Sequence, residues 1–413
     1  MSSFATTTLL DRFLRYVRID TQADERSTTY PSTPGQLDLS RMLTDELRAL
    51  GLADARMTEF GIVHATIPGN VPGAPTIAFN SHVDTSPETS GKNVKPQILR
   101  QYAGGDITLP GDPSKVIRVS ENPTLDDLIG KTIITTDGTT LLGADDKAGV
   151  AVIMEAARIL SENPSIPHGL VKVVFTCDEE IGKGVVHLEP SDLQAVAAYT
   201  LDGAGTSEVE SETFSADKAT VTIHGVNIHP SVGKGRMVNA VRLAGNFLER
   251  MPKRVLSPET TEDREGFLHP YTIEGGVAEV KIHILLRDFE TPKLAEQAAM
   301  LREIGQQIER EYPAAKVEID VKAQYRNMRD GMEREPRAVP YALEAVKRAG
   351  MTPRQTSIRG GTDGSQLTAK GLPTPNLSTG EHNPHSPLEW TCLEEMDAAV
   401  RVIVELVQVW AGR

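Results

Sequence analysis

The sequence predicts an α/β fold in which a discontinuous main domain carries a smaller inserted domain of βαββαβ order. A chain of 413 residues is too long for one ordinary hydrophobic core, so two domains are expected. Strand-like and helix-like apolar patterns alternate over about the first 210 residues and resume after residue 326, which favours βα units around a mainly parallel sheet. Between these stretches the apolar period switches in the order βαββαβ, which predicts a compact two-layer unit.

The first part of the main domain spans residues 1–213. It opens with an amphipathic helix whose apolar residues recur at helical spacing: Leu9, Leu10, Phe13, Leu14 and Val17. This start lacks the basic residues and apolar core of a signal peptide, so we expect a cytoplasmic protein. Two further helices are predicted over 37–50 and 147–160. The segment 86–130, rich in glycine, proline and charge, is expected to form surface loops with short strands.

The inserted domain spans residues 214–326, and the main domain continues over 327–413. The insertion contains, in order, strand ADKATVTIHGV, helix MVNAVRLAGNFLERM, strand HPYTIEG, strand VAEVKIHILLRDF, helix PKLAEQAAMLREIGQQIEREY and strand AKVEIDVKAQY. In the last part we expect a helix over 338–349, the glycine-rich loop IRGGTDGS (358–365), another strand and a final helix, CLEEMDAAVRVIVELVQVW.

Composition and charge argue against several classes of partner. Hydrophobic residues make up 39% and charged residues 24% of the chain, as in soluble globular proteins, and no apolar run is long enough to cross a bilayer. The net charge of −14 argues against nucleic acid or an anionic membrane as a partner. The two cysteines, Cys177 and Cys392, lie far apart among apolar residues, and a reduced cytoplasmic chain is the simpler interpretation.

Side chains that bind divalent metals follow separate strand-like runs along the chain. They are His82 and Asp84 after TIAFN, Asp145 in LLGADDKAG, Glu179 and Glu180 after VKVVFT, Asp202 after AAYT, and His385 after LPTPNLS. Open α/β sheets place ligand sites beyond the carboxyl ends of their strands, so these side chains are expected in one pocket. Two histidines and several carboxylates, without cysteine, suit zinc, cobalt or manganese.

A centre with two metal ions needs a bridging carboxylate, with one histidine and one further carboxylate for each ion. Asp145 is the natural bridge. His82 and Asp202 would complete the ligands of one ion, and His385 and Glu180 those of the other. Two ions about 3.5–4 Å apart lower the pKa of a bridging water and stabilise an oxyanion, so the sequence predicts metal-assisted amide hydrolysis.

Two acidic residues remain for other roles. Glu179 is expected to act as a general base beside the bridging water and to pass its proton to the leaving amine. Asp84 lies two residues after His82, where it can accept the other imidazole N–H and hold the ring. His382 lies three residues before His385 in the same loop, and on spacing alone either of these two histidines could bind the metal.

With these motifs in place, nearly the whole chain resembles the tripeptide aminopeptidase branch of the co-catalytic zinc peptidase family, which includes aminoacylase, carboxypeptidase G and succinyl-diaminopimelate desuccinylase. The segments that carry the resemblance are SHVDTSP, DGTTLLGADDKAG, FTCDEEIGKG, YTLDG, GVNIHPSVGKGRMVNA, LLRDF and IRGGTDGS. The resemblance implies a zinc-peptidase-like central mixed sheet flanked by helices and an inserted lid or dimerisation domain. It also implies a monomer or homodimer with two Zn²⁺ per subunit, for which Co²⁺ or Mn²⁺ could substitute.

The resemblance implies a role for each residue of the site. Five residues would be the metal ligands: His82, Asp145, Glu180, Asp202 and His385. Asp84 would orient a histidine, and Glu179 would be the general base. The family's last histidine is followed by a small residue and then an acidic one, as in HSPLE, which selects His385 over His382. Aromatic residues usually stand at the positions of His382 and Pro384, so this loop departs from the family pattern.

In the inserted domain the resemblance assigns residues to the substrate. The family holds an oxyanion with the histidine of a His-Pro-Gly turn, and here His229-Pro230-Ser231 keeps the histidine and loses the glycine. The family binds the substrate carboxylate with an arginine and an asparagine, which correspond to Arg287 and Asn239. The loop from Arg359 to Gly361 is expected to add backbone contacts.

We therefore expect a dinuclear zinc aminopeptidase that removes the N-terminal residue from tripeptides, with small peptides as its partners. The metals would hold the scissile carbonyl, and Arg287 with Asn239 would hold the C-terminal carboxylate at a fixed distance. Closure of 214–326 over the substrate would bring His229 to the oxyanion. The alternatives are a di-zinc dipeptidase, carboxypeptidase or N-acyl-amino-acid deacylase, and a metal-binding protein without catalysis, against which the extra carboxylate of Glu179 argues.

Overall fold

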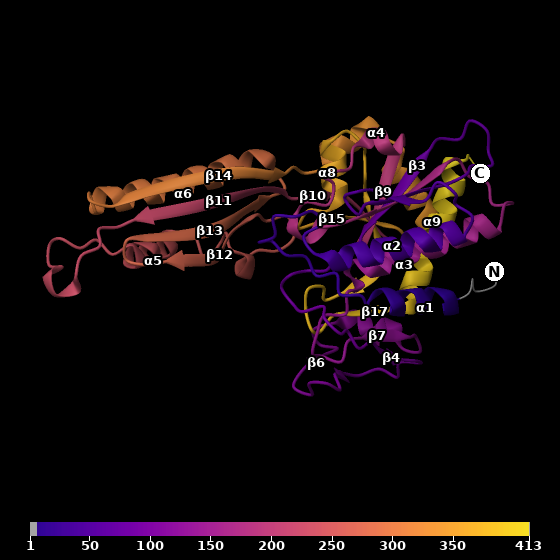
Figure 1. Ribbon diagram of the computed structural model, residues 1–413, viewed down its shortest axis with the longest axis horizontal. Coiled ribbons are helices and arrows are strands. Elements are labelled where there is room, and N and C mark those ends of the chain that lie inside the picture. The colour runs from indigo at the N-terminus through magenta and orange to yellow at the C-terminus, as the bar shows by residue number, and fades with distance from the viewer. Residues whose placement is uncertain (1–5, 413) are drawn as a thin grey trace. The chain divides into compact units, whose positions relative to one another are not determined.

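The computed structural model describes residues 6–412, which form two compact units (Figure 1). The first unit contains the described residues up to Ser211, Met328–Thr356, and the residues from Thr362 onwards. The second unit contains Glu212–Asn327 and the short segment Ser357–Gly361. The first unit is therefore assembled from three stretches of the chain.

Ser357–Gly361 belongs to the second unit, although the boundaries predicted from the sequence leave it out. Arg359 donates a hydrogen bond from Nη1 to the carbonyl oxygen of Asp263 (3.0 Å). A Cβ on Gly361 would lie 2.4 Å from the ring of Tyr325, so a residue with a side chain would clash there. These contacts join residues far apart in sequence, which is why the local apolar pattern does not reveal them.

The first unit is built around a mixed sheet. Along its main path the strands follow the order β1 (Arg56–Met57), β2 (Val63–Ile67), β8 (Val171–Thr176), β3 (Ile77–His82), β9 (Ala197–Ala204), β16 (Asn376–His382), β17 (Trp390–Cys392), β7 (Ile133–Thr135) and β4 (Gln97–Leu99). Off this path, β10 (Glu208–Thr213) pairs with β16 and with β15 (Arg354–Ile358). The last two residues of β10 and of β15 belong to the second unit. Strands β8, β3, β9 and β16 are mutually parallel, whereas the outer pairs are antiparallel. The expectation of a mainly parallel sheet is thus correct only for its centre.

Helices cover both faces of this sheet. One hydrophobic core joins it to α1 (Thr6–Tyr16), α2 (Pro34–Ala49), α3 (Ala144–Glu162), α7 (Ala338–Arg348) and α9 (Leu393–Trp410). A smaller core includes residues of α4 (Pro190–Leu193) and α8 (Asp363–Ala369). Alternate residues of β3 enter the two cores, with Ile77 and Phe79 in the first and Ala78 in the second, as the alternation of side chains along a strand requires. A central mixed sheet flanked by helices confirms the predicted fold class.

The segment 86–130 has a small hydrophobic core of its own. It contains β4, the two-stranded sheet of β5 (Ile107–Thr108) and β6 (Val116–Ile117), and the 3-10 helix η1 (Pro123–Leu128). Its buried side chains, which include Tyr102, Leu109 and Leu125, pack against Trp390 from far along the chain. The expected short strands are present, but this tryptophan makes the segment a packed part of the first unit and not only a set of surface loops.

The second unit is a four-stranded sheet with two helices packed on it. Its strands follow the order β12 (Phe267–Gly275), β13 (Glu279–Asp288), β11 (Ser215–His224) and β14 (Lys316–Tyr325), all antiparallel. Helices α5 (Ala240–Arg250) and α6 (Thr291–Glu311) bury their apolar residues against it, and the chain order is βαββαβ. The remaining 3-10 helices are η2 (Glu179–Ile181) and η5 (Arg329–Arg334) in the first unit, and η3 (Pro230–Val232) and η4 (Pro258–Thr260) in the second.

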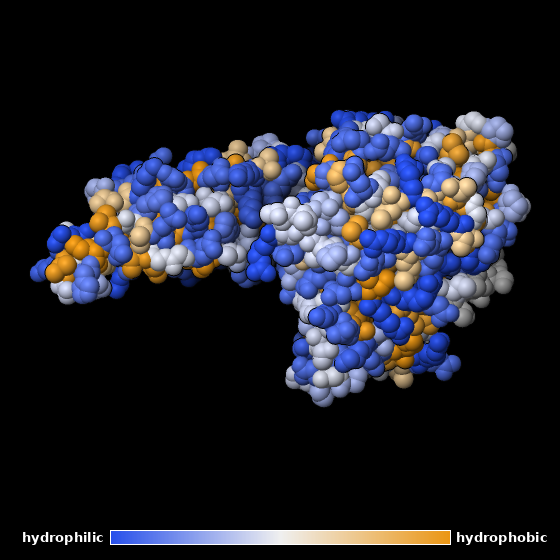
Figure 2. Space-filling view, viewed as in Figure 1, coloured by the Kyte–Doolittle hydropathy of each residue, from blue (hydrophilic) through white to orange (hydrophobic). Residues whose placement is uncertain are grey.

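Hydrophilic residues cover most of the face of the molecule that Figure 2 shows. Among residues 6–412, no helix combines the length and the apolar composition needed to cross a membrane. Cys177 and Cys392 are both buried and form no disulfide. The thiol of Cys392 donates a hydrogen bond to Oε2 of Glu394 (3.3 Å).

The parallel strands place the candidate site residues along one edge of the sheet. Since β3, β8, β9 and β16 run in the same direction, their carboxyl ends meet there. His82 is the last residue of β3, and Glu179 follows β8 within three residues of its end. Asp202 lies in β9, and Asp145 lies in the first turn of α3.

Replacing Gly149 by alanine tests how closely α3 approaches the sheet. A Cβ at this position would lie 1.9 Å from the carbonyl oxygen of Leu201 and 2.8 Å from Oγ of Ser81, so the helix would have to move away from β9 and β3. We expect Gly149→Ala to lower the free energy of unfolding by about 3 kcal/mol. Both tryptophans of the chain, Trp390 and Trp410, lie in the first unit, so fluorescence-detected urea unfolding reports on that unit.

Gly245→Ala is the matched control. Gly245 also lies within a helix, α5, and nothing lies within 4 Å of its Cβ position. Circular dichroism, which reports on both units, should show unchanged or slightly higher stability for this variant. A Gly149→Ala protein as stable as the wild type would contradict the close approach of α3 to the sheet.

Candidate metal centre

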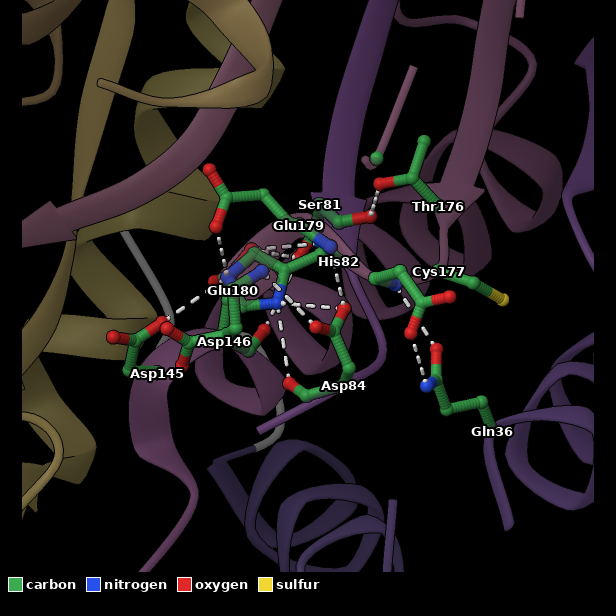
Figure 3. A network of polar contacts seen from close by, with 12 residues as sticks. Gln36, Ser81, His82, Asp84, Asp145, Asp146, Thr176, Cys177, Glu179 and Glu180 are labelled. Atoms are coloured by element: carbon green, nitrogen blue, oxygen red, sulfur yellow. Dashed lines mark hydrogen bonds and ion pairs between the residues drawn. The ribbon is translucent and has the colours of Figure 1, made fainter. Parts of the chain in front are cut away.

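Asp145 faces two histidines that come from distant parts of the chain. Nε2 of His82 lies 3.1 Å from Oδ1 of Asp145 (Figure 3). Nε2 of His385 lies 3.2 Å from the other oxygen, Oδ2. The two oxygens of one carboxylate therefore face two different imidazoles, which is the arrangement that a bridging ligand between two ions requires.

Each histidine has a second carboxylate near its Nε2 atom. Nε2 of His82 lies 3.9 Å from Oδ1 of Asp202, and Nε2 of His385 lies 2.9 Å from Oε2 of Glu180. The structure thus brings the five expected ligands together in two groups that share Asp145. His82, Asp145 and Glu180 also present ligand atoms within 4.8 Å of one another.

This donor set fits divalent metal ions of the zinc type. Imidazole nitrogens and carboxylate oxygens, without thiolates, are ligands for Zn²⁺, Co²⁺ and Mn²⁺. Oε1 of Glu180 is buried and has no hydrogen-bond partner among the residues that the structure describes. A buried oxygen of this kind costs free energy unless a cation or a donor satisfies it, so the side chain suits a metal ligand.

Burial makes the acidic residues of this centre hard to ionise on their own. Burial and the charge of Asp145 raise the pKa of Glu180 to about 7, and the same two causes raise the pKa of Asp202 well above its ordinary value. The pKa of Glu179 is also raised well above its ordinary value, mainly by burial. A bound cation would offset this cost, because it favours the charged form of each carboxylate.

The protons of the two histidines partly take the place of such a cation. Although burial opposes it, hydrogen bonds with Asp145 and Asp84 raise the pKa of His82 well above its ordinary value. Against the same effect of burial, hydrogen bonds with Asp145 and Glu180 raise the pKa of His385 to about 12. Burial on its own would raise the pKa of Asp145. Hydrogen bonds with the two histidines have the larger effect, and the pKa lies below its ordinary value. Metal binding must therefore displace the histidine protons.

Asp84 contacts His82 and also holds the turn that carries Glu179 and Glu180. Nδ1 of His82 lies 3.1 Å from the carbonyl oxygen and 3.4 Å from Oδ1 of Asp84. The carboxylate of Asp84 accepts hydrogen bonds from the backbone amides of Glu179 (3.1 Å) and Glu180 (3.1 Å), one on each oxygen. Asp84 therefore fixes these two glutamates relative to His82, a connection that the expected orienting role does not include.

Asp178 anchors the same turn to helix α2. Its backbone has a left-handed conformation, with φ of +62°. Its carboxylate accepts hydrogen bonds from the amide of Ser32 (2.6 Å) and from Nε2 of Gln36 (2.6 Å). The amide oxygen of Gln36 in turn accepts a hydrogen bond from the backbone amide of Asp178 (3.0 Å). Both the side chain and the backbone of Asp178 are therefore bound to α2 and the residues before it, which fixes the turn between β8 and the glutamates.

Glu389 holds the loop that delivers Asp145. Its carboxylate accepts hydrogen bonds from the backbone amides of Leu142 (2.7 Å), Gly143 (2.8 Å) and Asp145 (3.0 Å). Burial nevertheless raises its pKa to about 7. The motif HSPLEW contains this residue, but its spacing gives no sign that it contacts a loop so far away in sequence.

Asp146, next to the bridging position, fixes the end of strand β3. Its carboxylate accepts hydrogen bonds from the backbone amide of His82 (3.1 Å) and from the hydroxyl of Ser81. It also accepts the amide of Gly149 (3.1 Å) within α3. The acidic pair in LLGADDKAG thus has two roles: Asp145 faces the histidines, and Asp146 ties the helix to the strand.

Two more buried acids lie close to the centre, and no sequence motif marks either as part of it. Glu381 presents an oxygen within 4.8 Å of those of Asp145 and Asp202. Asp363 accepts a hydrogen bond from Oγ1 of Thr176 (2.5 Å). Burial raises the pKa of Asp363 to about 6 and that of Glu381 well above its ordinary value. Asp363 lies in the glycine-rich motif IRGGTDGS, for which the sequence predicts only backbone contacts of Arg359 to Gly361 with the substrate.

His385, and not His382, reaches Asp145. The ring of His382 stacks on that of Trp390, with 3.7 Å between centroids and 3° between planes. Nε2 of His382 lies 2.7 Å from Oε2 of Glu395. Both contacts hold His382 within the packed interior, and of these two histidines His385 is the one that lies beside Asp145.

The second unit carries His229 and Asn239, each in a defined hydrogen-bonded state. Nδ1 of His229 lies 2.7 Å from Oγ of Ser231 and accepts a hydrogen bond from the amide of the same serine (3.3 Å). Because Nδ1 is an acceptor, the neutral ring carries its proton on Nε2. Oδ1 of Asn239 caps helix α5, where it accepts hydrogen bonds from the backbone amides of Val241 (2.9 Å) and Arg242 (3.4 Å).

Arg287 lies on strand β13 of the second unit. Its Nη1 atom donates hydrogen bonds to the carbonyl oxygens of Asp217 (3.1 Å) and Leu286 (3.0 Å). Its guanidinium carbon lies 5.5 Å from the centroid of the Tyr325 ring. The same ring packs against Gly361, so two of the expected substrate-binding residues meet on one tyrosine.

The side chain of Arg359 is bound within its own unit. Its Nη2 atom donates to the carbonyl oxygen (3.3 Å) and to Oγ1 (3.1 Å) of Thr261. Its guanidinium also lies over the rings of Phe214 and Phe267. The arginine side chain therefore holds the loop to Thr261 and Asp263 of the same unit.

A comparison with known proteins identifies the family. The family model described as peptidase family M20/M25/M40 matches residues 137–409 of the chain. The chain belongs to this family. A peptidase T of Geobacillus thermodenitrificans (strain NG80-2) is 43% identical over 403 residues, which cover 97% of this chain and 98% of that protein. The family membership that the motifs predict is thus confirmed.

Two solved structures of M20 peptidases and their relatives share the fold. The aminopeptidase PepT from Bacillus cereus ATCC 10987 matches with a TM-score of 0.76 at 24% identity and covers 100% of both chains. A dinuclear metal-binding peptidase of the M20 family from Bacillus subtilis matches with a TM-score of 0.63 at 15% identity and covers 98% of both chains. At these identities the likeness concerns the fold alone.

Removal of metal should make stability fall as the pH rises from about 4.5 to 7. Glu180 has an ordinary pKa of 4.5, and burial raises it to about 7 in the folded chain without metal. Over this window the folded state binds more protons than the unfolded state, so the free energy of unfolding decreases with pH. Glu389 has the same two values and adds to the same trend.

The test is urea unfolding, followed by tryptophan fluorescence, at pH 5.5 and 7.5 with a chelator or with zinc. We expect the chelated protein to unfold at a lower urea concentration at pH 7.5 than at pH 5.5. Zinc should raise the unfolding midpoint more at pH 7.5 than at pH 5.5. If the unfolding midpoint of the chelated protein instead rises from pH 5.5 to pH 7.5, burial does not raise the pKa of these carboxylates in the metal-free protein.

Proposed function

We propose that this protein is a dinuclear zinc aminopeptidase that removes the N-terminal residue from tripeptides. The observation that carries the proposal is the carboxylate of Asp145, which faces His82 with one oxygen and His385 with the other. The 43% identity with a peptidase T over nearly the full length of both chains supports the substrate class. The free, buried cysteines accord with a cytoplasmic location.

Five residues would hold the two zinc ions: His82, Asp145, Glu180, Asp202 and His385. When bound, the ions supply a Lewis acid for the scissile carbonyl and lower the pKa of the attacking water. The chain itself keeps these ligands in place through Asp84, Asp146 and Glu389, whose carboxylates bind the backbone amides of the ligand-bearing segments. Co²⁺ or Mn²⁺ would be accepted by the same donors.

Glu179 would move the proton of the reaction. Its Oε2 atom lies 4.0 Å from Nε2 of His82, and its backbone is fixed by Asp84. As general base it takes a proton from the attacking water while the oxygen bonds to the scissile carbonyl carbon. It then gives the proton to the amine nitrogen as the carbon–nitrogen bond breaks. A carboxyl whose pKa is raised by burial is suited to both halves of this transfer.

Residues of the second unit would bind the rest of the substrate. With Nδ1 of His229 engaged by Ser231, its Nε2–H is the donor available to an oxyanion. The cap of α5 uses Oδ1 of Asn239, which leaves its N–H donors for a carboxylate. Arg287 commits only Nη1 to the backbone oxygens and can bind a carboxylate through its other nitrogens. A carboxylate grip at a fixed distance from the metal centre would measure substrate length.

Product analysis by mass spectrometry tests the proposed function. Free di-, tri- and tetrapeptides and N-acyl amino acids are incubated with the zinc-loaded protein, with and without a chelator. We expect tripeptides to yield a free N-terminal residue and a dipeptide, and the chelator to stop the reaction. Release of the C-terminal residue, preferred cleavage of dipeptides, or removal of an acyl group would assign a different substrate, and no hydrolysis by protein with two bound zinc ions would exclude catalysis.

Glu179→Gln should abolish turnover without removing zinc. The amide cannot accept the proton of water, so we expect kcat to fall by about a thousandfold, within the range known for general bases. Zinc content, measured by atomic absorption, should stay near the wild-type value, because Glu179 is not among the five ligands. Glu59→Gln, which alters an exposed carboxylate of the same unit, is the control and should behave as wild type. Wild-type kcat in the Glu179 variant would remove the base assignment.

Arg287→Ala should weaken the recognition of the C-terminal carboxylate. We expect KM for free tripeptides to rise about tenfold or more, since a charge-assisted hydrogen bond is lost. Tripeptide amides, which have no such carboxylate, should be hydrolysed equally by variant and wild type. Arg302→Ala, on the exposed surface of α6, is the control. An unchanged preference of the Arg287 variant for free tripeptides over amides and tetrapeptides would count against the ruler.

A further inference from the structure

His82 and His385 are held in different ways. His82 ends a buried strand, and the carbonyl and carboxylate of Asp84 lie behind its Nδ1 atom at 3.1 and 3.4 Å. His385 lies in a loop after strand β16, has a positive φ of +60°, and leaves 36% of its side chain exposed. A histidine in such a loop needs other support if its Nε2 is to stay directed at Asp145 and Glu180.

The segment after His82 supplies that support from two adjacent residues. Oε2 of Glu88 lies 3.3 Å from Nδ1 of His385, on the opposite side of the ring from Asp145. Oγ1 of Thr89 donates a hydrogen bond to the carbonyl oxygen of His385 (2.6 Å). One contact thus holds the imidazole and the other holds the backbone of the same residue.

The turn that carries Glu88 and Thr89 is itself fixed. Nε2 of Gln22 donates hydrogen bonds to the carbonyl oxygens of Ser86 (3.3 Å) and Thr89 (3.1 Å). The amide of Glu88 donates to Oγ of Ser86 (3.3 Å). A support can orient another residue only if it is held in turn, and these bonds meet that condition.

We propose that Glu88 and Thr89 position His385 for the second metal ion. Glu88 accepts the Nδ1–H of His385, which leaves Nε2 unprotonated and available as the ligand atom. Thr89 keeps the loop in the position from which that nitrogen reaches Asp145 and Glu180. The two residues do for His385 what Asp84 does for His82. The inference rests on the proposed dinuclear centre and adds two positioning residues to it.

An exposed ion pair without function is the competing explanation, because 71% of the Glu88 side chain is exposed. Exposed pairs contribute little on average. The two explanations differ in what they predict for metal affinity: loss of a residue that orients a ligand weakens binding by about 10- to 100-fold, whereas loss of a surface pair leaves it unchanged. Given the exposure of Glu88, we expect a change of about tenfold.

Zinc titration of the metal-free, full-length protein against a competing chelator is the test. Glu88→Gln and Thr89→Val should each weaken one of the two zinc-binding steps by about tenfold and leave the other unchanged. Thr89→Ser keeps the hydroxyl and should bind as wild type. Glu121→Gln changes an exposed carboxylate of the same 86–130 segment and is the matched control. Cobalt titration, followed by visible absorption, gives a second readout of which site has changed.

The outcomes separate this inference from the proposed function. If the wild type binds two zinc ions and both Glu88→Gln and Thr89→Val match it at both steps, the positioning role is wrong while the metal centre stands. If both steps weaken equally in a variant, the effect is a general loss of structure and the inference also fails. If the wild type binds no zinc, the proposed function fails first.

Discussion

The structure depends on how the chain accommodates many carboxylates that are buried together. They fall into two classes. One class is supplied with backbone N–H donors: Asp84, Asp146, Asp178 and Glu389. Burial raises the pKa in both classes, for example to about 7 in both Glu389 and Glu180. The second class, which includes Glu180 and Asp202, instead faces the histidine nitrogens, and a positive charge offsets the cost of its burial. The first class builds the frame, and the second class faces the position that metal ions would take.

The frame explains why single loops can present ligands with definite geometry. Each segment that carries a candidate ligand is bound through its backbone, so its position does not depend on the side chain that would bind metal. Glu389 holds the approach to Asp145, and Asp84 holds the turn of Glu179 and Glu180. Asn376 does the same for Asp202, with hydrogen bonds to its amide (3.1 Å) and its carbonyl oxygen (2.7 Å). Ligand and support are different residues throughout.

The sequence predicts the residues that face one another in the candidate centre better than it predicts the residues that support them. His82, Glu180 and Asp202 follow strand-like apolar runs, and parallel strands bring such positions to one edge, so a local pattern is enough to place them together. Glu389 stands near the predicted histidine, yet the backbone amides that it binds lie more than two hundred residues away in sequence. A residue whose role is set by a distant contact leaves no periodic signal, which is why Glu389 and Glu88 become visible only in the fold.

The same reasoning explains where the fold predicted from the sequence differs from the structure. The period of apolar residues identifies β11 to β14 and their two helices, because each element buries one regular face. It does not identify Ser357–Gly361 as part of the second unit, since that segment is attached by hydrogen bonds to Asp263 and by the approach of Gly361 to Tyr325. Nor does it show that 86–130 has a core, because Trp390 completes that core from the other end of the chain.

The order of strands in the sheet also has a consequence for protein synthesis. Strand β16 lies between β9 and β17, and β7 and β4 join the rest of the sheet only through β17. A chain still attached to the ribosome and lacking residues 376–392 therefore has its earlier strands in two separate groups, and Asp145 has no His385 beside it. The sheet of the first unit therefore depends on contacts between strands far apart in sequence, and it can be completed only after residues 376–392 have been made. The five residues that would hold metal are thus together only after His385 has been made, and a growing chain that stops before this residue lacks one side of the proposed centre.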